Sequence, residues 1–266
     1  MRIQHNIMAM NANRNLGVNN RNLSKNLEKL SSGYRINRAG DDAAGLAISE
    51  KMRADVAIYD QAINNANDGI SMIQTAEGAL QEVHDMLNRM ETLATQAANG
   101  TYGSTELTKI NAEVTALESE ITRIQSTTKF NGIQLFGTTK NIDFQVGQSA
   151  ANTISLNKDD IKTLTVNIDL TSQSKALTAI KTIKSNIETV STTRGNLGAL
   201  QNRLEHTVKN LGVTMENLQN AESQIRDTNV ADEMMAYTKN SILMQSAQAM
   251  LAQANQVPQG VLQLMQ

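Results

Sequence analysis

The chain has 266 residues and a formal net charge of −2, with 3% aromatic residues, no tryptophan, no cysteine and a single proline. The lack of cysteine excludes disulfides, thiolate nucleophiles and cysteine-ligated metals, and the near-neutral charge gives no reason to expect a nucleic acid or an anionic membrane as partner. Aromatic side chains usually dominate burial in a globular core. So few of them predict long helices that pack through narrow aliphatic seams.

The first predicted element is an N-terminal helix with an apolar stripe. The stripe contains Ile3, Ile7 and Met10 and, after a shift in phase, Leu16, Leu23, Leu27, Leu30 and Tyr34. This spacing is typical of heptads. The other face carries asparagine and arginine, and asparagine disfavours an isolated helix. We therefore expect this helix to need a partner.

A charged bend follows at residues 29–49, KLSSGYRINRAGDDAAGLAIS. Glycines let a chain turn, and the bend contains Gly33, Gly40 and Gly45. Asp41 or Asp42 is suited to cap the next helix. The two aspartates are an alternative cation site, but adjacent helical residues do not face the same way, so capping and charge pairing are favoured.

Two helices are predicted after the bend. The first begins near Asp41 or Asp42 and runs to about Asn99, where NGTYGS is a stop signal. Its apolar stripe comprises Ile70, Ile73, Ala76, Leu80, Val83, Leu87, Met90 and Ala94. The second carries Ile110, Val114, Leu117, Ile121 and Ile124, again at helical spacing.

The periodicity changes to two from about Lys129. Short alternating pieces contain Ile133 and Leu135; Ile142, Phe144 and Val146; Ile154 and Leu156; and Leu164, Val166 and Ile168. Asn-Gly and Gly-Thr turns separate some of them, so we predict β-hairpins over about residues 129–172. All three phenylalanines lie in this region, which predicts a small conventional core there.

The helical period returns from about Ser174 to Arg226. The apolar residues that keep one phase are Leu177, Ile180, Ile183, Ile187, Val190, Leu197, Leu204, Val208, Leu211, Met215, Leu218 and Ile225. The C-terminal segment repeats the spacing with Leu243, Ala247, Met250, Ala254, Val257, Val261 and Leu264. The predicted fold class is therefore mainly α, with long paired helices in coiled-coil-like bundles and a small central β-hairpin region. Stripes at the two ends of the chain can pair with each other.

Motifs for catalysis and cofactor binding are not found. His5, His84 and His206 are isolated, and the chain has no HExxH and no phosphate-binding glycine loop. The 13 methionines mostly sit on or beside the stripes, where packing is a more common role than metal binding. We expect no enzyme activity, no cofactor and no metal.

Two classes of function remain. One is a structural subunit that assembles with copies of itself, and the other is a coiled-coil adaptor. Adaptor coiled coils usually carry charged residues beside the seam to choose a partner. The stripes here are flanked by Asn, Gln, Ser and Thr instead, which favours self-assembly.

No apolar run approaches the ~18 to 20 residues needed to span a bilayer. The N-terminal sequence MRIQHNIMAMNANRN lacks the apolar region and cleavage site of a secretory signal peptide. We therefore expect no membrane insertion, and any export must use a route without a cleaved signal.

The chain resembles bacterial flagellin in three long motifs. LSSGYRINRAGDDAAGLAISEKMR resembles the flagellin signature, and MRIQHNIMAMNANRNL resembles a flagellin N-terminus. NLQNAESQIRDTNVADEMMAYTKNSILMQSAQAMLAQANQVPQGVLQLMQ resembles its C-terminus. The resemblance implies a secreted, extracellular subunit of the flagellar filament used for swimming. A hook–filament junction protein is a related alternative.

The resemblance also implies an arrangement in shells. Residues 1–42 and 227–266 look like paired helices of an inner tube, and residues 43–226 look like the next shell. About 45 residues lie between Lys129 and Ser174, so the large outer variable domains of longer flagellins are missing. The connector between the shells would contain Gly33, Arg35, Arg38, Gly40, Asp41 and Asp42, with its charges bonding to neighbours.

Further partners are implied by the resemblance alone. They are a flagellar export chaperone acting on the C-terminal segment, a filament cap, hook-junction proteins and an innate immune Toll-like receptor of a host. The segment LNRMETLATQAANGT resembles the helix that such a receptor recognises. By this motif, the contact would comprise Arg89, Leu93 and Gln96, with Glu113 on the adjoining helix. The same spacing also describes an ordinary helix face.

The expected mechanism is mechanical. Stripes flanked by Asn and Gln cannot offset their ordering entropy alone, so the termini of a free subunit should be disordered and should fold on incorporation. The residues expected to carry this assembly are Ile3, Ile7, Leu23, Leu27, Leu30, Leu243, Met250, Leu251, Val261 and Leu264.

Overall fold

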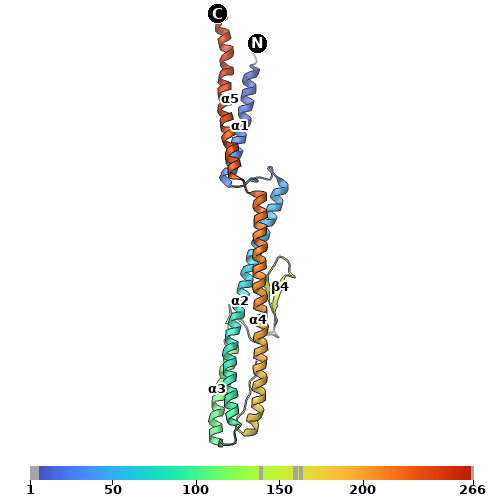
Figure 1. The fold of residues 1–266 in the computed structure, drawn as a ribbon, viewed down its shortest axis with the longest axis vertical. Coiled ribbons are helices and arrows are strands. Elements are labelled where there is room, and N and C mark those ends of the chain that lie inside the picture. Colours follow the sequence, from blue (N-terminus) through green and yellow to red (C-terminus); the bar gives the residue numbers. More distant parts are fainter. Residues whose placement is uncertain (1–5, 138–139, 158–160, 162–163, 265–266) are drawn as a thin grey trace. The chain divides into compact units, whose positions relative to one another are not determined.

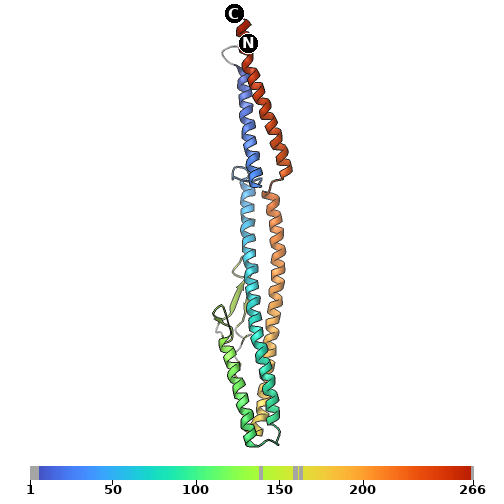
Figure 2. The same ribbon diagram turned by 90° about the vertical axis from the view of Figure 1, so that its left-hand side faces the viewer.

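The computed structural model describes residues 6–137, 140–157, 161 and 164–264, with the backbone alone at 258–259 and 261–264. These residues form a mainly α protein, as predicted (Figures 1 and 2). The helices are α1 (Ile7–Ser32), α2 (Ala43–Ala97), α3 (Ser104–Thr127), α4 (Gln173–Arg226) and α5 (Val230–Leu264). The strands are β1 (Lys129–Phe130), β2 (Ile133–Gln134), β3 (Ile142–Gln145) and β4 (Thr153–Leu156).

The chain divides into two compact units. The terminal unit comprises Met1–Val56 and Glu216–Gln266, and the central unit comprises Ala57–Met215. The predicted boundaries, at 42/43 and 226/227, follow helix ends instead. α2 and α4 continue through the division, so the first turns of α2 and the last turns of α4 belong to the terminal unit.

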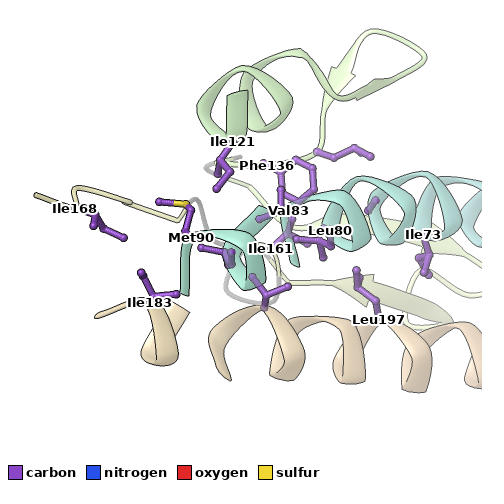
Figure 3. Packing of buried hydrophobic residues seen from close by; sticks show 14 of the residues in the cluster. Ile73, Leu80, Val83, Met90, Ile121, Phe136, Ile161, Ile168, Ile183 and Leu197 are labelled. Carbon is purple, nitrogen blue, oxygen red and sulfur yellow. The ribbon is translucent and has the colours of Figure 1, made fainter. Parts of the chain in front are cut away.

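The central unit has a continuous apolar core between its long helices (Figure 3). α2 and α4 run antiparallel, as shown by the ion pairs of Glu77 with Arg194 and of Glu91 with Lys184. The predicted α2 stripe is buried from Ile73 to Ala94, with Ile70 half-buried. On α4 the buried residues recur every seven positions at Ile183, Val190, Leu197 and Leu204. The predicted apolar stripe of α2 and the heptad-like spacing of α4 are therefore confirmed.

One predicted member of the α4 stripe is wrong. Leu177 is 54% exposed, whereas Ala176 and Ala179 are buried in the first turns of the helix. The small alanine side chains allow close packing at this end. A pattern search that favours large apolar residues selects the leucine between them.

Two short hairpins lie between α3 and α4. Phe130 pairs with Ile133 across the Asn-Gly turn predicted from the sequence. Asn131 and Gly132 have φ values of 48° and 82°, as a type I′ turn requires. β3 and β4 are antiparallel, with Phe144 opposite Ile154. These alternating pieces were correctly predicted as strands.

The alternating piece Leu164, Val166 and Ile168 is not a strand, contrary to prediction. It is an extended segment that leads towards α4, and Ile168 is buried. A buried extended backbone needs hydrogen-bond partners. In this protein the partners are side chains of a helix rather than another strand.

Three polar residues of α3 at intervals of seven supply these partners. An interval of seven returns to the same helix face after nearly two turns. The bonds are Leu164 N to Gln125 Oε1 at 2.8 Å, Ile168 N to Glu118 Oε1 at 2.5 Å, and Leu170 N to Asn111 Oδ1 at 2.8 Å. We call Asn111, Glu118 and Gln125 the polar ladder. It substitutes for a neighbouring strand, which explains why a correct period of two did not produce a hairpin.

Candidate assembly surfaces

α1 and α5 form an antiparallel pair within the terminal unit (Figures 1 and 2). Asn6 Nδ2 donates a hydrogen bond to the carbonyl oxygen of Ala254 at 2.7 Å. Near the other end, Lys29 Nζ lies 3.9 Å from Glu233 Oε2. These two contacts fix the register of the helices. The predicted pairing of the two ends of the chain is confirmed.

The seam between α1 and α5 is thin. Its residues follow a 3-4 spacing and comprise Ala9, Ala12, Leu16, Asn19, Leu23, Asn26 and Leu30, with Glu233, Tyr237, Asn240, Met244, Ala247, Leu251 and Ala254. Among the described side chains of these two helices, only Asn26 and Ala254 are fully buried. Alanine and asparagine occupy many seam positions, so the pair buries little apolar surface within one subunit.

Large apolar side chains remain exposed on both helices. We call them the outer apolar residues: Ile7, Met10, Val18 and Leu27 on α1, and Met235, Ile242, Leu243 and Met250 on α5. Leu27 is 54% exposed and Met250 is 64% exposed. Such a concentration of exposed apolar side chains marks an interaction surface.

The structure divides the predicted assembly stripes into two sets. Leu23, Leu30 and Leu251 are half-buried at seam positions. Ile7, Leu27, Leu243 and Met250 are exposed. Ile3 and the side chains of Val261 and Leu264 lie outside the described residues. A single stripe on each helix was therefore wrong, because it merged the seam with the exposed set. It included Ala247 and Ala254 of the seam but passed over Ala9, Ala12 and the seam asparagines.

The segment that follows α1 is hydrogen-bonded to the segment that joins α4 to α5. Tyr34 and Asp227 form an antiparallel bridge, in which Arg35 N donates to the Arg226 carbonyl at 2.7 Å and Thr228 N donates to the Gly33 carbonyl at 2.9 Å. Gly33 has a φ of 75° and ends α1 in the left-handed conformation. We call residues 33–36 and 224–228 the clasp.

Charged side chains reinforce the clasp. The Arg35 guanidinium donates to the carbonyls of Ile225, at 2.6 Å, and Gln224, at 3.3 Å. It thus places a cation at the negative end of α4. The Arg226 guanidinium lies 4.7 Å from the centre of the Tyr34 ring and donates to Glu50 Oε1 at 2.7 Å.

The remaining predicted connector residues also find partners inside the chain. Arg38 pairs with Glu28 at 2.8 Å. Asp42 accepts the Gly45 N–H at 2.9 Å, as predicted for the cap of α2. The backbone N–H groups of Arg38 and Asn37 hold the pKa of Asp41 below its ordinary value. Gly40 has no positive φ, so the turn does not depend on it.

The sequence did not identify Arg226 of the clasp or its partner Glu50. Arg226 and Glu50 lie 176 positions apart, and no local spacing connects them. The sequence does indicate that Arg226 is a cation in the last turn of a long helix, where basic residues are favoured. That signal does not identify its carboxylate or aromatic partner.

The residues of the predicted receptor contact lie in the central unit. Arg89 donates to Glu113 Oε1 at 2.9 and 2.8 Å, and Gln96 donates to the Tyr102 hydroxyl at 3.0 Å. Arg89, Gln96 and Glu113 are exposed. Leu93 is 3% exposed and belongs to the core. The prediction that Leu93 lies on this exposed surface was therefore wrong.

The described residues contain no group of three His, Cys, Asp or Glu side chains arranged to hold a metal ion. Among the described helices, none is apolar enough over sufficient length to cross a bilayer. The structural features that can serve an assembly function are the exposed apolar residues of the terminal helices and the clasp.

Comparison with known proteins agrees with this emphasis on the helical ends. Residues 3–141 match the bacterial flagellin N-terminal helical region, and residues 180–265 match the bacterial flagellin C-terminal helical region. The chain belongs to the flagellin family. A flagellin of Halalkalibacterium halodurans is 52% identical, and one of Bacillus subtilis is 47% identical, each over 100% of both chains.

Solved structures give the same relationship. The crystal structure of Bacillus cereus flagellin is 30% identical with a TM-score of 0.50, covering 56% of this chain and 88% of that one. A putative flagellar hook-associated protein from Vibrio parahaemolyticus has a TM-score of 0.61 over 70% of this chain and 100% of its own, but at 14% identity it shows the fold alone.

This flagellin is a structural subunit of the bacterial flagellar filament, which is the extracellular part of the flagellum, and it is not an enzyme. A flagellar filament 33 kDa core protein of Treponema phagedenis is 46% identical over 100% of both chains. Full coverage of short relatives agrees with a short flagellin that lacks large outer domains.

Proposed function

We propose that this flagellin joins the filament by burying the outer apolar residues of α1 and α5 against neighbouring copies. The observation that carries the proposal is the exposure of large apolar side chains on two helices whose mutual seam is thin. Contacts between different surfaces of identical subunits produce open helical polymers when the rotation does not close. In this scheme residues 1–42 and 227–266 form the inner layer of the filament, and residues 43–226 the next.

In this proposal the α1–α5 pair is only weakly held in a free subunit, and the terminal helices gain most of their stability on incorporation. The central unit has a core of large buried side chains, whereas the α1–α5 pair buries only Asn26 and Ala254 fully among its described side chains. Ordering a residue costs roughly 1–2 kcal/mol of backbone entropy, which a thin seam offsets poorly. Neighbouring subunits supply the missing apolar contact.

Seeded growth tests the proposal. Leu27→Asp introduces a charge at an exposed apolar position, and we expect it to block elongation of filament seeds while leaving the central unit folded. Asn22→Asp, on the exposed surface of the same helix, adds the same charge without removing an apolar group and should elongate. Electron microscopy scores filament length, and circular dichroism scores folding. Normal elongation of Leu27→Asp would refute the role of the outer apolar residues.

A second variant separates the seam from the outer set. Leu251 is half-buried at a seam position, so Leu251→Asp should both open the α1–α5 pair and block elongation. Leu27→Asp should block elongation alone. Amide hydrogen exchange in residues 230–257 distinguishes the two outcomes, because only the Leu251 variant should exchange faster than the unaltered chain.

We propose, on the family relationship, that export proceeds through the flagellar pathway with a chaperone bound to the C-terminal segment. The exposed apolar residues of α5 give a chaperone a surface to cover before assembly. A filament cap and hook-junction proteins complete the expected partners. Copurification of a chaperone with the full chain, and its loss after removal of residues 230–266, would support this assignment.

We also propose a host Toll-like receptor contact on the surface formed by Arg89, Gln96 and Glu113. Exposure of these side chains favours it, as does the Arg89–Glu113 pair, in which two guanidinium N–H groups donate to Glu113 Oε1. Arg89→Ala should reduce receptor binding by the free subunit about tenfold, as expected when a charged anchor is lost. Lys109→Ala, a charge removal at an exposed position of the adjoining helix α3, serves as control. Equal binding by both variants would refute the assignment.

A further inference from the structure

The most exposed of the described methionines all lie in the terminal unit. Five described methionines are between 47% and 66% exposed, and all lie on the terminal helices: Met8, Met10, Met234, Met235 and Met250. In the central unit, Met72 and Met90 are 4% and 0% exposed. Met86 and Met215 of that unit are half-buried. Exposed methionine is thus concentrated on the helices that carry the proposed assembly surface.

The positions on α5 are also aligned with its other apolar residues. At about 100° per residue, Met235, Ile242 and Met250 lie within about 80° of one another around the helix. The seam residues Met244 and Leu251 lie on roughly the opposite side. Met235 and Met250 therefore contribute to the surface that faces away from α1, together with Ile242 and Leu243.

Composition leaves methionine as the first target of a peroxide. The chain has no cysteine and no tryptophan. Hydrogen peroxide transfers one oxygen atom to a methionine sulfur: the O–O bond breaks, an S–O bond forms, the sulfur is oxidised by two electrons, and the peroxide is reduced to water. The product is a polar sulfoxide, which disrupts methionine-rich interfaces and is returned to methionine by sulfoxide reductases.

We propose that the exposed methionines of α1 and α5 are sites of reversible oxidation that controls whether a free subunit can join the filament. The inference rests on the proposed function, because the sulfoxide acts by adding an unsatisfied polar group to a surface that assembly must bury. Oxidation leaves the core of the central unit intact, since its core methionines Met72 and Met90 are buried. In a filament the same terminal methionines are covered and react slowly.

Site selectivity is the first test. Free subunits are treated with dilute hydrogen peroxide, and sulfoxide is measured at each methionine by peptide mass spectrometry. Met8, Met10, Met235 and Met250 should oxidise at least about tenfold faster than Met72 and Met90, and the terminal sites should react more slowly in filaments. Equal rates at terminal and central sites, or equal rates in subunits and filaments, would overturn the inference.

Seeded elongation is the second test. Oxidised full-length subunits should elongate seeds about tenfold more slowly than untreated ones, which is the effect of burying one or two unsatisfied polar groups. Treatment with methionine sulfoxide reductases A and B should restore the rate. Unchanged elongation by fully oxidised subunits, or a loss that the reductases do not reverse, would overturn the inference. Failure of untreated subunits to elongate would instead refute the proposed function.

A matched pair of variants locates the effect. Met235→Leu with Met250→Leu keeps the apolar volume of α5 and removes its two most exposed methionines. Met8→Leu with Met10→Leu does the same on α1. Peroxide should slow the variant that carries all four leucines much less than it slows the unaltered chain. Equal inhibition of this variant would show that the loss of elongation arises elsewhere.

Discussion

Gly33 ends α1 with a φ of 75°, a conformation that favours glycine because it lacks a Cβ atom. The sequence contains several glycines in the same bend and does not tell which one turns the chain. Gly40 has open space around it and no positive φ. At Gly45 an added Cβ would lie 2.5 Å from Asp42 Oδ2 and 2.9 Å from the Ile36 side chain. The three glycines thus have three different roles, which residue type alone could not separate.

Substitution of these glycines distinguishes the roles. Gly33→Ala should destabilise the terminal unit by about 1 kcal/mol, because alanine must adopt a left-handed conformation there. Gly40→Ala should be neutral, since its site has room and ordinary backbone angles. Urea denaturation followed by circular dichroism measures the difference. A greater loss for Gly40→Ala than for Gly33→Ala would contradict the assignment.

Arg226 is the residue on which the clasp side chains converge. Its side chain is 12% exposed and contacts both Glu50 and Tyr34. Arg226→Gln removes the charge that both contacts need, and we expect a loss of about 1–2 kcal/mol of stability in the terminal unit. Arg53→Gln, which removes a more exposed arginine that also pairs with Glu50, should cost less. Equal losses would argue against a special role for Arg226.

At the scale of elements, prediction from periodicity succeeded for helices that have a single apolar face. Apart from Leu177, the stripes of α2 and α4 are correct because large aliphatic residues recur on one buried face. The stripes of α1 and α5 were misread because each helix has apolar residues on two faces. The extended segment at residues 164–170 was misread because side chains of α3 satisfy its backbone. The spacing of apolar residues along the chain shows neither which of two apolar faces packs inside the subunit nor which side chains bond to a distant backbone.

The polar ladder makes a pH-dependent prediction. Burial of the Glu118 carboxyl raises its pKa, although the Ile168 N–H opposes the shift. A raised pKa means that folding favours the protonated acid, so the stabilisation by Glu118 is greatest at low pH and falls as pH rises above the ordinary value of 4.5. Glu118→Gln keeps an acceptor without the charge. We expect it to match the unaltered chain near pH 4 and to exceed it in stability at pH 7.

The matching deletion completes this test. Glu118→Ala leaves the buried N–H of Ile168 without its acceptor, so it should lose about 1–3 kcal/mol at either pH. Urea denaturation at the two pH values compares the three proteins. A glutamine variant that is less stable than the unaltered chain at pH 7 would show that the charge, and not the acceptor, holds the segment.

At the scale of the whole molecule, the family was predictable because long motifs at both ends of the chain resemble flagellin, and the family models match there. The fold class was predictable because helical periodicity is sustained over most of the chain. The division into compact units was not, because α2 and α4 continue through it without any break in helical pattern. The clasp draws the ends of these helices into the terminal unit through contacts between residues nearly 200 positions apart.

A truncated chain tests how independent the units are. The fragment 43–226 retains the core of the central unit but loses Tyr34 and Asp227 of the clasp. We expect it to keep its helicity between residues 57 and 215, to fray at both new ends, and to fail to elongate seeds. Circular dichroism, hydrogen exchange and electron microscopy check these points. Elongation by the fragment would contradict assembly through the terminal helices.

The hydrogen bond from Asn6 to Ala254 joins positions 248 residues apart. Any process that delivers the chain from one end to the other, whether synthesis or passage through a channel, must release almost all of it before this contact can form. The first terminal helix to be released therefore has no partner until the helix at the other end of the chain is released. The α1–α5 pair can therefore form only after nearly the whole chain has been released. A partly released subunit cannot offer the paired helices to a neighbouring copy.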